Sequence, residues 1–535
     1  MLNPIRGTRG MVTAPHGLAA QSGLAVLREG GNALEAMIAA ASTIAVVYPH
    51  MNGIGGDSFW LVHDPKDGRE TVHALDACGS AAAGVRRETY LDEGLKAIPF
   101  RGGSAATTVA GTVSGWARAF DFSRDKMAGK LPLARLLSDA IHYAKSGIPV
   151  TTSQANNTKN KLTELKPQPG FAHTFLIDGK LPQAGELFFQ PRMAATLEQL
   201  ARAGLDDYYQ GDLARTIDAD LIAAGSPVRL SDLQAHQAVW KKALCLQHSK
   251  GRIFNQPPST QGIVSLIILG LMDRLGIERF DHLSADYVHA AVEATKRAFQ
   301  IRDQYITDPK HMLVDPQSFL AADNLDSLAH GIDMARALVW GQGKGPADTI
   351  WMGAIDGEGR AVSFIQSIYH EFGSGVVLKN SGINWQNRGC SFSLDPKALN
   401  PLEPGRKPFH TLNPAMALLE DGRTMVYGNM GGDGQPQSQS AVFTRCIVHG
   451  MNPAAAIAAP RWLLGRTWGQ TTDSLKLEAR FPPETIAELK RRGHDVELYP
   501  DFDETLGHAG AVIRSPNGSF EGGTDPRSDG AVAGY

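Results

Sequence analysis

Two hydroxyl side chains, Thr349 and Ser367, fall on the two arms of a predicted β-hairpin. Strand-like residues run from 347 to 356 and from 360 to 369, on either side of Gly357-Glu358-Gly359. A three-residue hairpin loop needs one residue with positive φ, which glycine adopts without strain. Counting outward from this loop places Thr349 opposite Ser367, and opposed side chains on one face lie about 5 Å apart. Most such hydroxyl pairs in strands have no chemical role, so the pattern alone is weak evidence for a catalytic site.

The glycine-rich turn 428–436 is a second stretch whose residue types could support chemistry. It lies between a predicted strand at 425–427 and a helix-like segment at 438–449. A turn in this position exposes backbone N–H groups at a helix N-terminus, where a phosphate or a developing oxyanion can bind. The turn lacks the GK[ST] sequence of a phosphate-binding P-loop.

The elements that must position these residues are predicted from periodicity and capping signals. A helix is expected from Gly17 to Glu29, and a second, small and apolar on all sides, is expected to be buried up to Val47. Asn32 and Glu35 have the spacing of a capping box at the start of that second helix. A long amphipathic helix is expected at 284–304.

Length and composition describe an ordinary globular protein. The chain has 535 residues, of which 43% are hydrophobic and 20% are charged, and its net charge is −3. This length predicts one large two-lobed unit or two to three domains. The slightly negative charge and the lack of a basic run predict no nucleic-acid partner.

The sequence also bears on compartment and cofactors. The apolar run 36–47 is too short to span a bilayer, so no membrane partner is expected. Residues 1–16 contain no apolar signal core, and a cytoplasmic location is expected, with a removed leader left open. The scattered cysteines fit reduced thiols better than a disulfide framework or a zinc site, and neither a metal nor another cofactor is expected. They are Cys78, Cys245, Cys390 and Cys446.

With these motifs in view, the chain resembles the γ-glutamyltranspeptidase family of N-terminal nucleophile hydrolases from residue 11 to the end. Each motif alone is weak, but six in the family's order are specific. They are Gly30-Gly31-Asn32-Ala33, Pro49-His50-Met51 through Gly56, Gly111-Thr112-Val113, Asp348-Thr349, Gly431-Gly432 and Asp525-Pro526-Arg527-Ser528.

The resemblance implies an αββα sandwich that matures by cutting its own backbone between Asp348 and Thr349. Residues 1–348 would form the large α subunit and residues 349–535 the small β subunit, together making one unit. The mature protein would be an α/β heterodimer, and further pairing of such heterodimers is left open.

The resemblance also implies roles at the hairpin and the turn. Thr349 would be the nucleophile, and its freed α-amine, with a reference pKa of about 7.7–8.0, would be the base. Ser367 would orient the nucleophile. The N–H groups of Gly431 and Gly432 would form the oxyanion hole, where losing one donor costs about 3–4 kcal/mol in the barrier.

Departures from the family pattern bear on the substrate. Family members that use glutathione bind its glutamyl group through an Arg, an Asn and an Asp. These positions align here with Asp76, Tyr369 and Ser391, while a Ser-Ser pair lining the hole becomes His410-Thr411. An aspartate would repel a carboxylate instead of pairing with it. We therefore expect a member of the amidohydrolase and acylase branches that cleaves a small, oxamate-like amide.

Two side chains could form a replacement pocket. Arg388 could read a substrate carboxylate or simply anchor its loop, and His410 could line the pocket or be structural. Tyr369 would fill space that a longer acyl group occupies in the transferases, which favours a small acyl group. The alternatives are a γ-glutamyltransferase or glutathione hydrolase, a β-lactam side-chain acylase, and an uncleaved relative kept as a binding protein.

Overall fold

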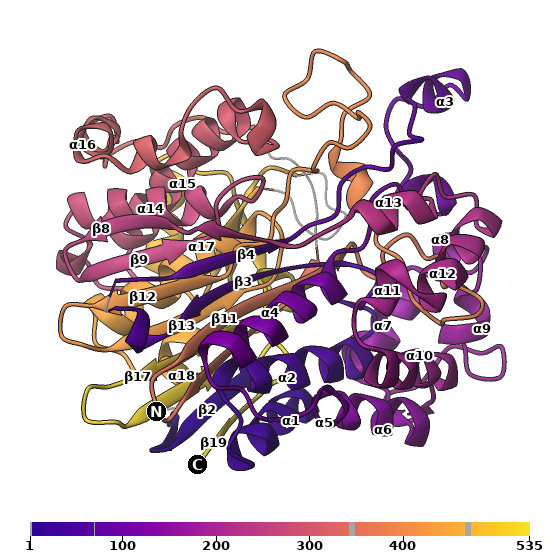
Figure 1. The fold of residues 1–535 in the computed structure, drawn as a ribbon. Coiled ribbons are helices and arrows are strands. Elements are labelled where there is room, and N and C mark those ends of the chain that lie inside the picture. Colours follow the sequence, from indigo (N-terminus) through magenta and orange to yellow (C-terminus); the bar gives the residue numbers. More distant parts are fainter. Residues whose placement is uncertain (1–2, 69, 342–347, 466–471) are drawn as a thin grey trace.

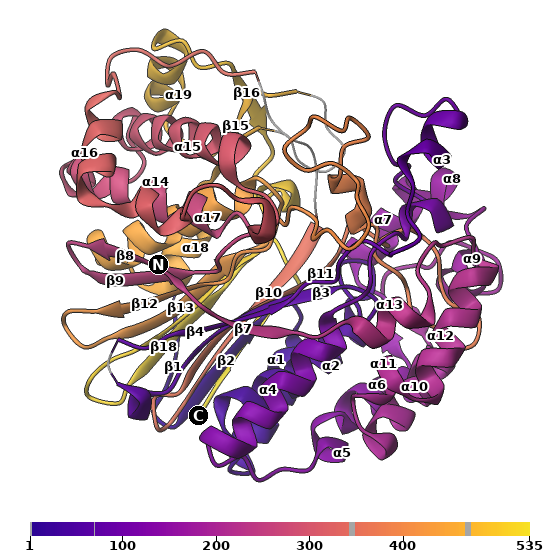
Figure 2. The same cartoon turned by 45° about the horizontal axis from the view of Figure 1, so that its top comes forward.

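Two seven-stranded antiparallel sheets stack face to face and carry helices on both outer surfaces (Figure 1). The computed structural model describes residues 3–68, 70–341, 348–465 and 472–535. Figure 2 shows both sheets between the two helical layers. The expected four-layer αββα architecture is therefore confirmed.

The first sheet holds the predicted hairpin at its centre, as strands β10 and β11. Strand β2 pairs with β10 on one side and β3 pairs with β11 on the other, so neither hairpin strand is at an edge. The strand order is β19 (Ala531–Gly534), β2 (Gly10–Ala14), β10 (Asp348–Asp356), β11 (Ala361–Tyr369), β3 (Asp57–His63), β4 (His73–Ala77) and β7 (Val239–Lys242).

The second sheet has β13 at its centre, the strand that leads into the glycine-rich turn. The strand order is β1 (Ile5–Gly7), β18 (Phe520–Thr524), β17 (Ala509–Arg514), β13 (Thr424–Asn429), β12 (Ala415–Leu419), β9 (Gly251–Asn255) and β8 (Leu244–His248). Two small sheets lie outside the sandwich. They contain β14 (Trp462–Leu464), β15 (Leu475–Glu478) and β16 (Val496–Tyr499), and β5 (Ile148–Pro149) with β6 (Leu187–Phe188).

Helices cover the outer face of each sheet. The first sheet is covered by α1 (Gly17–Arg28), α2 (Ala33–Val47) and α4 (Thr112–Lys126). The second is covered by α14 (Gly262–Arg274), α17 (Gly434–Phe443) and α18 (Pro453–Ala458). Helices α15 (Ala285–Tyr305), α16 (Ala322–His330) and α19 (Pro483–Arg491) lie further out. Within the described ranges, no helix combines the length and apolar character needed to cross a bilayer.

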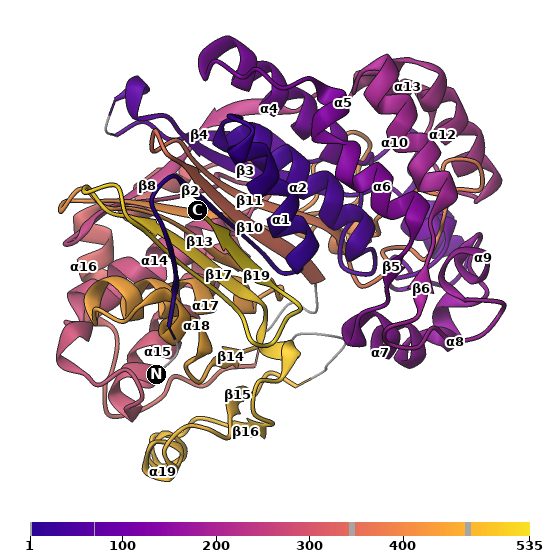
Figure 3. The same ribbon diagram turned by 90° about the horizontal axis from the view of Figure 1, so that it is seen from below.

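A lobe of short helices extends from one end of the sandwich, as seen from below in Figure 3. It contains α5 (Leu133–Leu136), α6 (Ser138–Ser146), α7 (Thr152–Asn160), α8 (Leu162–Leu165), α9 (Phe171–Phe175), α10 (Pro191–Ala203), α11 (Asp207–Gln210), α12 (Asp212–Ala223) and α13 (Leu230–Ala235). Helix α3 (Arg87–Asp92) projects separately.

The predicted capping box is confirmed at the start of α2. Asn32 Oδ1 accepts from the Glu35 N–H at 3.0 Å, and Glu35 Oε2 accepts from the Asn32 N–H at 2.9 Å. Every residue of α2 is buried, as its composition indicated, because the helix lies between the hairpin strands and other helices. The long amphipathic helix is confirmed as α15.

Trp351 fills the space between the sheets, and glycines on the facing sheet make room for it. A Cβ on Gly428 would lie 2.1 Å from the indole Cδ1, and one on Gly510 would lie 2.5 Å from Cζ3. The indole Nε1 donates to Ser363 Oγ at 2.9 Å, so its polar group is satisfied. This contact sets the spacing between β10, which carries Thr349, and β13, which leads into the turn.

We predict that Gly428→Ala destabilises the protein by about 1–3 kcal/mol, because the added methyl overlaps the buried indole. Chemical denaturation should show the loss. Gly84→Ala is the matched control, since a Cβ there would have its nearest neighbour at 3.5 Å, an ordinary contact. Equal stabilities for the two variants would contradict the assigned role of Trp351.

Candidate active site

Thr349 is buried near the start of β10, at a point where the hairpin ladder changes register. Pairs from 350 to 355 follow the predicted count, but the next pair joins Asp348 to Tyr369. Thr349 therefore faces two residues, Ser367 and its C-terminal neighbour, across a β-bulge. The expected one-to-one pairing is wrong at this position. Bulges re-aim side chains and are common next to active sites.

Ser367 is held by the strained residue that follows the bulge. Its Oγ accepts a hydrogen bond from the backbone N–H of Tyr369 at 2.8 Å. Tyr369 has a φ of +82°, a left-handed conformation that residues other than glycine rarely adopt. Such strain persists only where the surrounding structure enforces it, and it clusters at functional sites.

The glycine-rich turn joins β13 to α17, as the sequence predicted, with the helix beginning at Gly434. Gly431 and Gly432 have φ values of +111° and +50°. Their carbonyls accept from the backbone N–H groups of Gly434 at 2.8 Å and Gln435 at 3.2 Å. Within the described part of the chain, the N–H groups of both glycines make no hydrogen bond and are available to an oxyanion.

Gln435 connects the nucleophile to this turn. Its Nε2 lies 3.4 Å from Thr349 Oγ1, while its backbone N–H donates to the Gly432 carbonyl. Its Oε1 accepts from Asn413 Nδ2 at 3.2 Å, which fixes the orientation of the amide. The hydroxyl of Thr349 and the turn are thus held in one hydrogen-bonded unit.

A buried glutamine and a buried arginine hold the turn from the other side. Gln261 Nε2 donates to the carbonyls of Gly432 at 2.8 Å and Thr411 at 2.9 Å. Arg302 Nη1 donates to Gln261 Oε1 at 3.1 Å and to Asp433 Oδ1 at 2.7 Å. Because Arg302 is fully buried, these bonds have little competition from water.

Asp57 and His410 form a buried pair beside the acyl pocket predicted from sequence. Asp57 Oδ1 accepts from the N–H groups of Gly79 at 3.0 Å and Gly111 at 3.1 Å, and from Gln386 Nε2 at 3.2 Å. Asp57 Oδ2 lies 3.0 Å from His410 Nε2. If the Asp57 carboxylate is ionised it can only accept, so His410 carries its proton on Nε2 and Nδ1 is left as an acceptor.

The charges around this pair set the protonation of both the ring and the carboxyl group. Burial lowers the pKa of His410 well below its usual value, and the positive charges of Arg388 and Lys407 lower it further, so the ring is neutral. Burial raises the pKa of Asp57 to about 7, although the Gly79 N–H and Arg388 oppose the rise. Cys78 completes a possible set of three metal ligands, but the nearby positive charges disfavour a cation, and we assign none.

Arg388 is a fully buried guanidinium with unused donors. Its Cζ lies 3.8 Å from the centre of the Tyr369 ring, and its Nη1 lies 3.4 Å from Thr411 Oγ1. Its Nε and Nη2 have no hydrogen-bond partner among the described residues. Burial lowers the pKa of Arg388, but arginine remains charged in proteins. Leaving such donors unpaired is costly, so the site is suited to an anion.

The two remaining pocket residues predicted from sequence, Ser391 and Asp76, differ in whether their side chains have partners. Ser391 ends the same short 3-10 helix as Arg388, and its buried Oγ has no partner within the described ranges. Asp76 is different, because its carboxylate contacts Lys241 Nζ at 2.5 Å and Lys407 Nζ at 2.8 Å. Burial opposes ionisation of Asp76, yet the two lysines lower its pKa to about 2. The expectation that Asp76 contacts the substrate is therefore wrong, because its carboxylate is taken up by the two lysines.

Sequence reasoning gave no role to Gln435, Gln261, Asp57 or Arg302. Gln435 lies within the glycine-rich turn 428–436, but an amide side chain in the sequence carries no signal of its own, and the same holds for Gln261. Asp57 directly follows the motif that runs from Pro49 to Gly56, and nothing in that motif indicates a role for its carboxylate. Its link to His410 spans 353 residues and could not be seen in the sequence.

Comparisons with known proteins identify the family of this chain. The family model described as gamma-glutamyltranspeptidase matches residues 19–535. The chain is 58% identical over 528 residues to an oxamate amidohydrolase proenzyme from Klebsiella pneumoniae subsp. pneumoniae, covering 99% of both chains. It is 39% identical to the glutathione hydrolase-like YwrD proenzyme of Bacillus subtilis, with 100% of both covered. A crystal structure of cephalosporin acylase from Bacillus halodurans superimposes with a TM-score of 0.90 at 33% identity, covering 100% of this chain and 97% of that one. The chain therefore belongs to the gamma-glutamyltranspeptidase family.

Proposed function

We propose that this protein is a self-processing amide hydrolase that converts oxamate, or a close analogue with a carboxylate beside its amide carbonyl, into the dicarboxylate and ammonia. The observation that carries the substrate assignment is the buried Arg388, whose Nε and Nη2 lack partners among the described residues. The likeness to the oxamate amidohydrolase proenzyme supports the same assignment.

Maturation is the first reaction of the proposed site. The Thr349 hydroxyl attacks the carbonyl carbon of Asp348, the acyl group moves from nitrogen to oxygen, and water hydrolyses the resulting ester. The products are an α subunit of residues 1–348 and a β subunit of residues 349–535, which remain together because β10 pairs with β2 in the shared sheet. The new α-amine of Thr349 has a reference pKa of about 7.7–8.0, which suits a base near neutral pH.

Substrate turnover repeats this chemistry on a free amide. The Thr349 amine takes the proton of the hydroxyl, whose oxygen attacks the amide carbon of the substrate. The negative charge that develops on the carbonyl oxygen is stabilised by the N–H groups of Gly431 and Gly432, which are free within the described part of the chain. Ser367 orients the nucleophile from the opposite strand.

The intermediate then collapses, and the C–N bond breaks as the leaving nitrogen receives the proton held by the Thr349 amine. Ammonia leaves, and an oxalyl ester remains on Thr349. Water attacks this ester with the same amine as base, and oxalate is released. When Asp57 is ionised, its contact with Nε2 leaves the Nδ1 atom of His410 as an acceptor, which is suited to receive an N–H of the substrate amide.

The carboxylate of the substrate is proposed to lie against Arg388, with Thr411 and Ser391 beside it. An arginine fork can bind a carboxylate through two parallel hydrogen bonds. The Tyr369 ring packs on the guanidinium and occupies the space that a longer acyl chain would need. This arrangement favours a two-carbon acyl group over a glutamyl group or a bulky β-lactam side chain.

Thr349→Ala is expected to remain a single chain on a denaturing gel and to release no ammonia from oxamate, because the nucleophile of both reactions is lost. The wild type should resolve into two fragments whose masses match cleavage before Thr349. Thr89→Ala, at an exposed threonine, should cleave like the wild type. Cleavage of Thr349→Ala at the same bond would refute the assignment of the nucleophile.

Arg388→Met is expected to raise KM for oxamate by about 10²-fold or more, since losing one partner of a buried charge pair costs about 2–5 kcal/mol. Self-cleavage should continue, because cleavage of the Asp348–Thr349 bond does not require Arg388 to bind a substrate carboxylate. Arg86→Met, at an exposed arginine, is the control. An unchanged KM in Arg388→Met would show that another group reads the carboxylate.

The charge of the substrate provides an independent test. Oxamide replaces the carboxylate of oxamate by a neutral amide of similar size, so the wild type should prefer oxamate by about 10²-fold or more in kcat/KM. This preference should be largely lost in Arg388→Met. Ammonia release measures both substrates. A γ-glutamyl anilide tested beside them should release no chromophore, and rapid release would favour the transferase alternative.

A further inference from the structure

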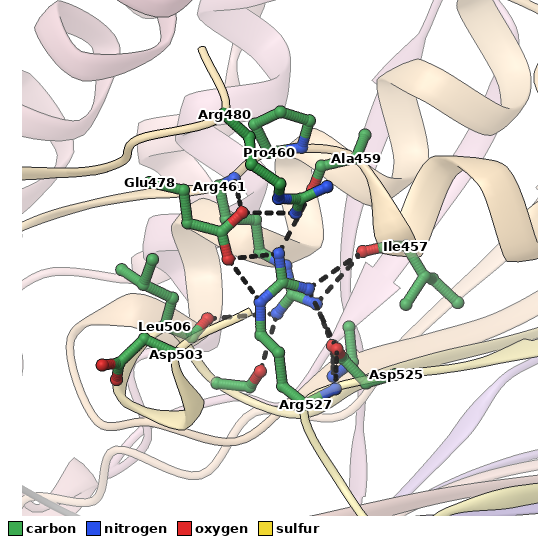
Figure 4. A network of polar contacts seen from close by, with 12 residues as sticks. Ile457, Ala459, Pro460, Arg461, Glu478, Arg480, Asp503, Leu506, Asp525 and Arg527 are labelled. Atoms are coloured by element: carbon green, nitrogen blue, oxygen red, sulfur yellow. Dashed lines mark hydrogen bonds and ion pairs between the residues drawn. The ribbon is translucent and has the colours of Figure 1, made fainter. Parts of the chain in front are cut away.

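The closing motif Asp525-Pro526-Arg527-Ser528, which the proposed reaction does not use, lies in a buried ionic cluster (Figure 4). Three arginines and two carboxylates meet where the small β14–β15 sheet approaches the C-terminal strands. Four of the five side chains are almost completely inaccessible to solvent. The members of this C-terminal cluster are Arg461, Glu478, Arg480, Asp525 and Arg527.

The two carboxylates of the cluster are engaged on both of their oxygens. Asp525 Oδ1 accepts from Arg527 Nη1 at 2.9 Å, and Oδ2 accepts from the backbone N–H of Ala509 at 2.7 Å and contacts Arg461 Nη2. Glu478 Oε1 accepts from Arg527 Nε at 2.6 Å, and Oε2 contacts Arg480. A buried pairing of this kind holds its members in one geometry.

Arg461 extends from this cluster toward the glycine-rich turn. Its Nη1 is directed at three acceptors, the side-chain Oδ1 of Asn429 at 3.3 Å and the carbonyls of Leu506 at 3.1 Å and Gly507 at 2.9 Å. Asn429 is the last residue of β13 and lies two positions before Gly431. One guanidinium therefore ties the end of β13 to the loop 506–508.

That loop packs tightly against the backbone of the turn. The Met430 N–H donates to the His508 carbonyl at 3.2 Å. A Cβ on Gly507 would lie 2.4 Å from both Asn429 Nδ2 and the Met430 carbonyl, and one on Gly431 would lie 3.6 Å from Gly507 Cα. The loop cannot shift toward the turn without displacing it, so the position of the loop controls the position of the turn.

We propose that Arg461 is a positioning residue for the oxyanion hole, which holds Asn429 and the loop 506–508 so that the N–H groups of Gly431 and Gly432 point at the reacting carbonyl oxygen. The inference rests on the proposed function for the role of those N–H groups. Donors of this kind act only when held within about 0.5 Å of the productive geometry, and losing one costs about 10²–10³ in kcat. The cluster supplies the rigid support that such precision requires.

The test compares two variants that cut the link with one that weakens the cluster elsewhere. Asn429→Ala removes the side-chain acceptor and leaves the ionic cluster intact, while Arg461→Lys keeps the charge and removes the fork. Arg480→Met is the control, because Arg480 pairs with Glu478 and has no contact with the turn in the described hydrogen bonds. All three are made in the full chain, and thermal unfolding verifies that each is folded.

Asn429→Ala and Arg461→Lys should lower kcat for oxamate and the rate of self-cleavage by about tenfold to 10²-fold, while KM for oxamate stays within about threefold of wild type. Arg480→Met should keep both rates within about twofold, even if it unfolds at a lower temperature. If Arg461→Lys fails to fold, Asn429→Ala decides the question alone.

The proposal is overturned if a folded Asn429→Ala keeps the wild-type rates, if its loss appears in KM alone, or if Arg480→Met loses kcat to the same extent. Self-cleavage needs no added substrate. A wild type that cuts itself but leaves oxamate intact would therefore refute the oxamate assignment, while the rates of self-cleavage would still test Arg461.

Discussion

A threonine buried near the start of a central strand is the constraint around which this molecule is built. The hydroxyl of Thr349 must be removed from bulk water and yet point at a reacting carbonyl. Thr349 is buried between the paired strand β11 and the turn that carries Gln435, and the bulge opposite Ser367 changes the direction of the strand where chemistry is needed. Stacking Trp351 on Gly428 then sets the distance between this strand and the sheet that carries the turn.

The burial of Thr349 also removes the other polar groups of the site from water. Each one must be hydrogen-bonded or pay the full cost of desolvation, and most are satisfied through long-range contacts. Gln435 links Thr349 to the turn, Gln261 and Arg302 hold the turn through further hydrogen bonds, and Asp57 orients His410. Around the pocket predicted from sequence, three side chains depart from this pattern within the described residues, because Arg388 Nε and Nη2, His410 Nδ1 and Ser391 Oγ lack partners. A cost of this kind is expected where a ligand completes the pairing.

Several parts of the fold could be predicted because their signals are local. The capping box of Asn32 and Glu35, the complete burial of α2 and the loop Gly357-Glu358-Gly359 all depend on residues a few positions apart. The register from 350 to 355 followed from the loop alone. The same count was wrong at Thr349, because a bulge is imposed by the neighbouring structure and leaves no mark in the alternation of strand residues.

The sequence by itself therefore determined the hairpin, the glycine-rich turn and the order of motifs that identifies the family. These features depend on backbone propensities and glycine positions, which are set by residues close together in the chain. Only the tertiary structure decided that Asp76 is paired with Lys241 and Lys407 and that His410 is held by Asp57. It also decided that Arg388 packs on the Tyr369 ring and has two nitrogens without a partner in the described part of the chain. The state of a buried charge depends on which groups lie within a few ångströms, and these groups come from segments hundreds of residues apart.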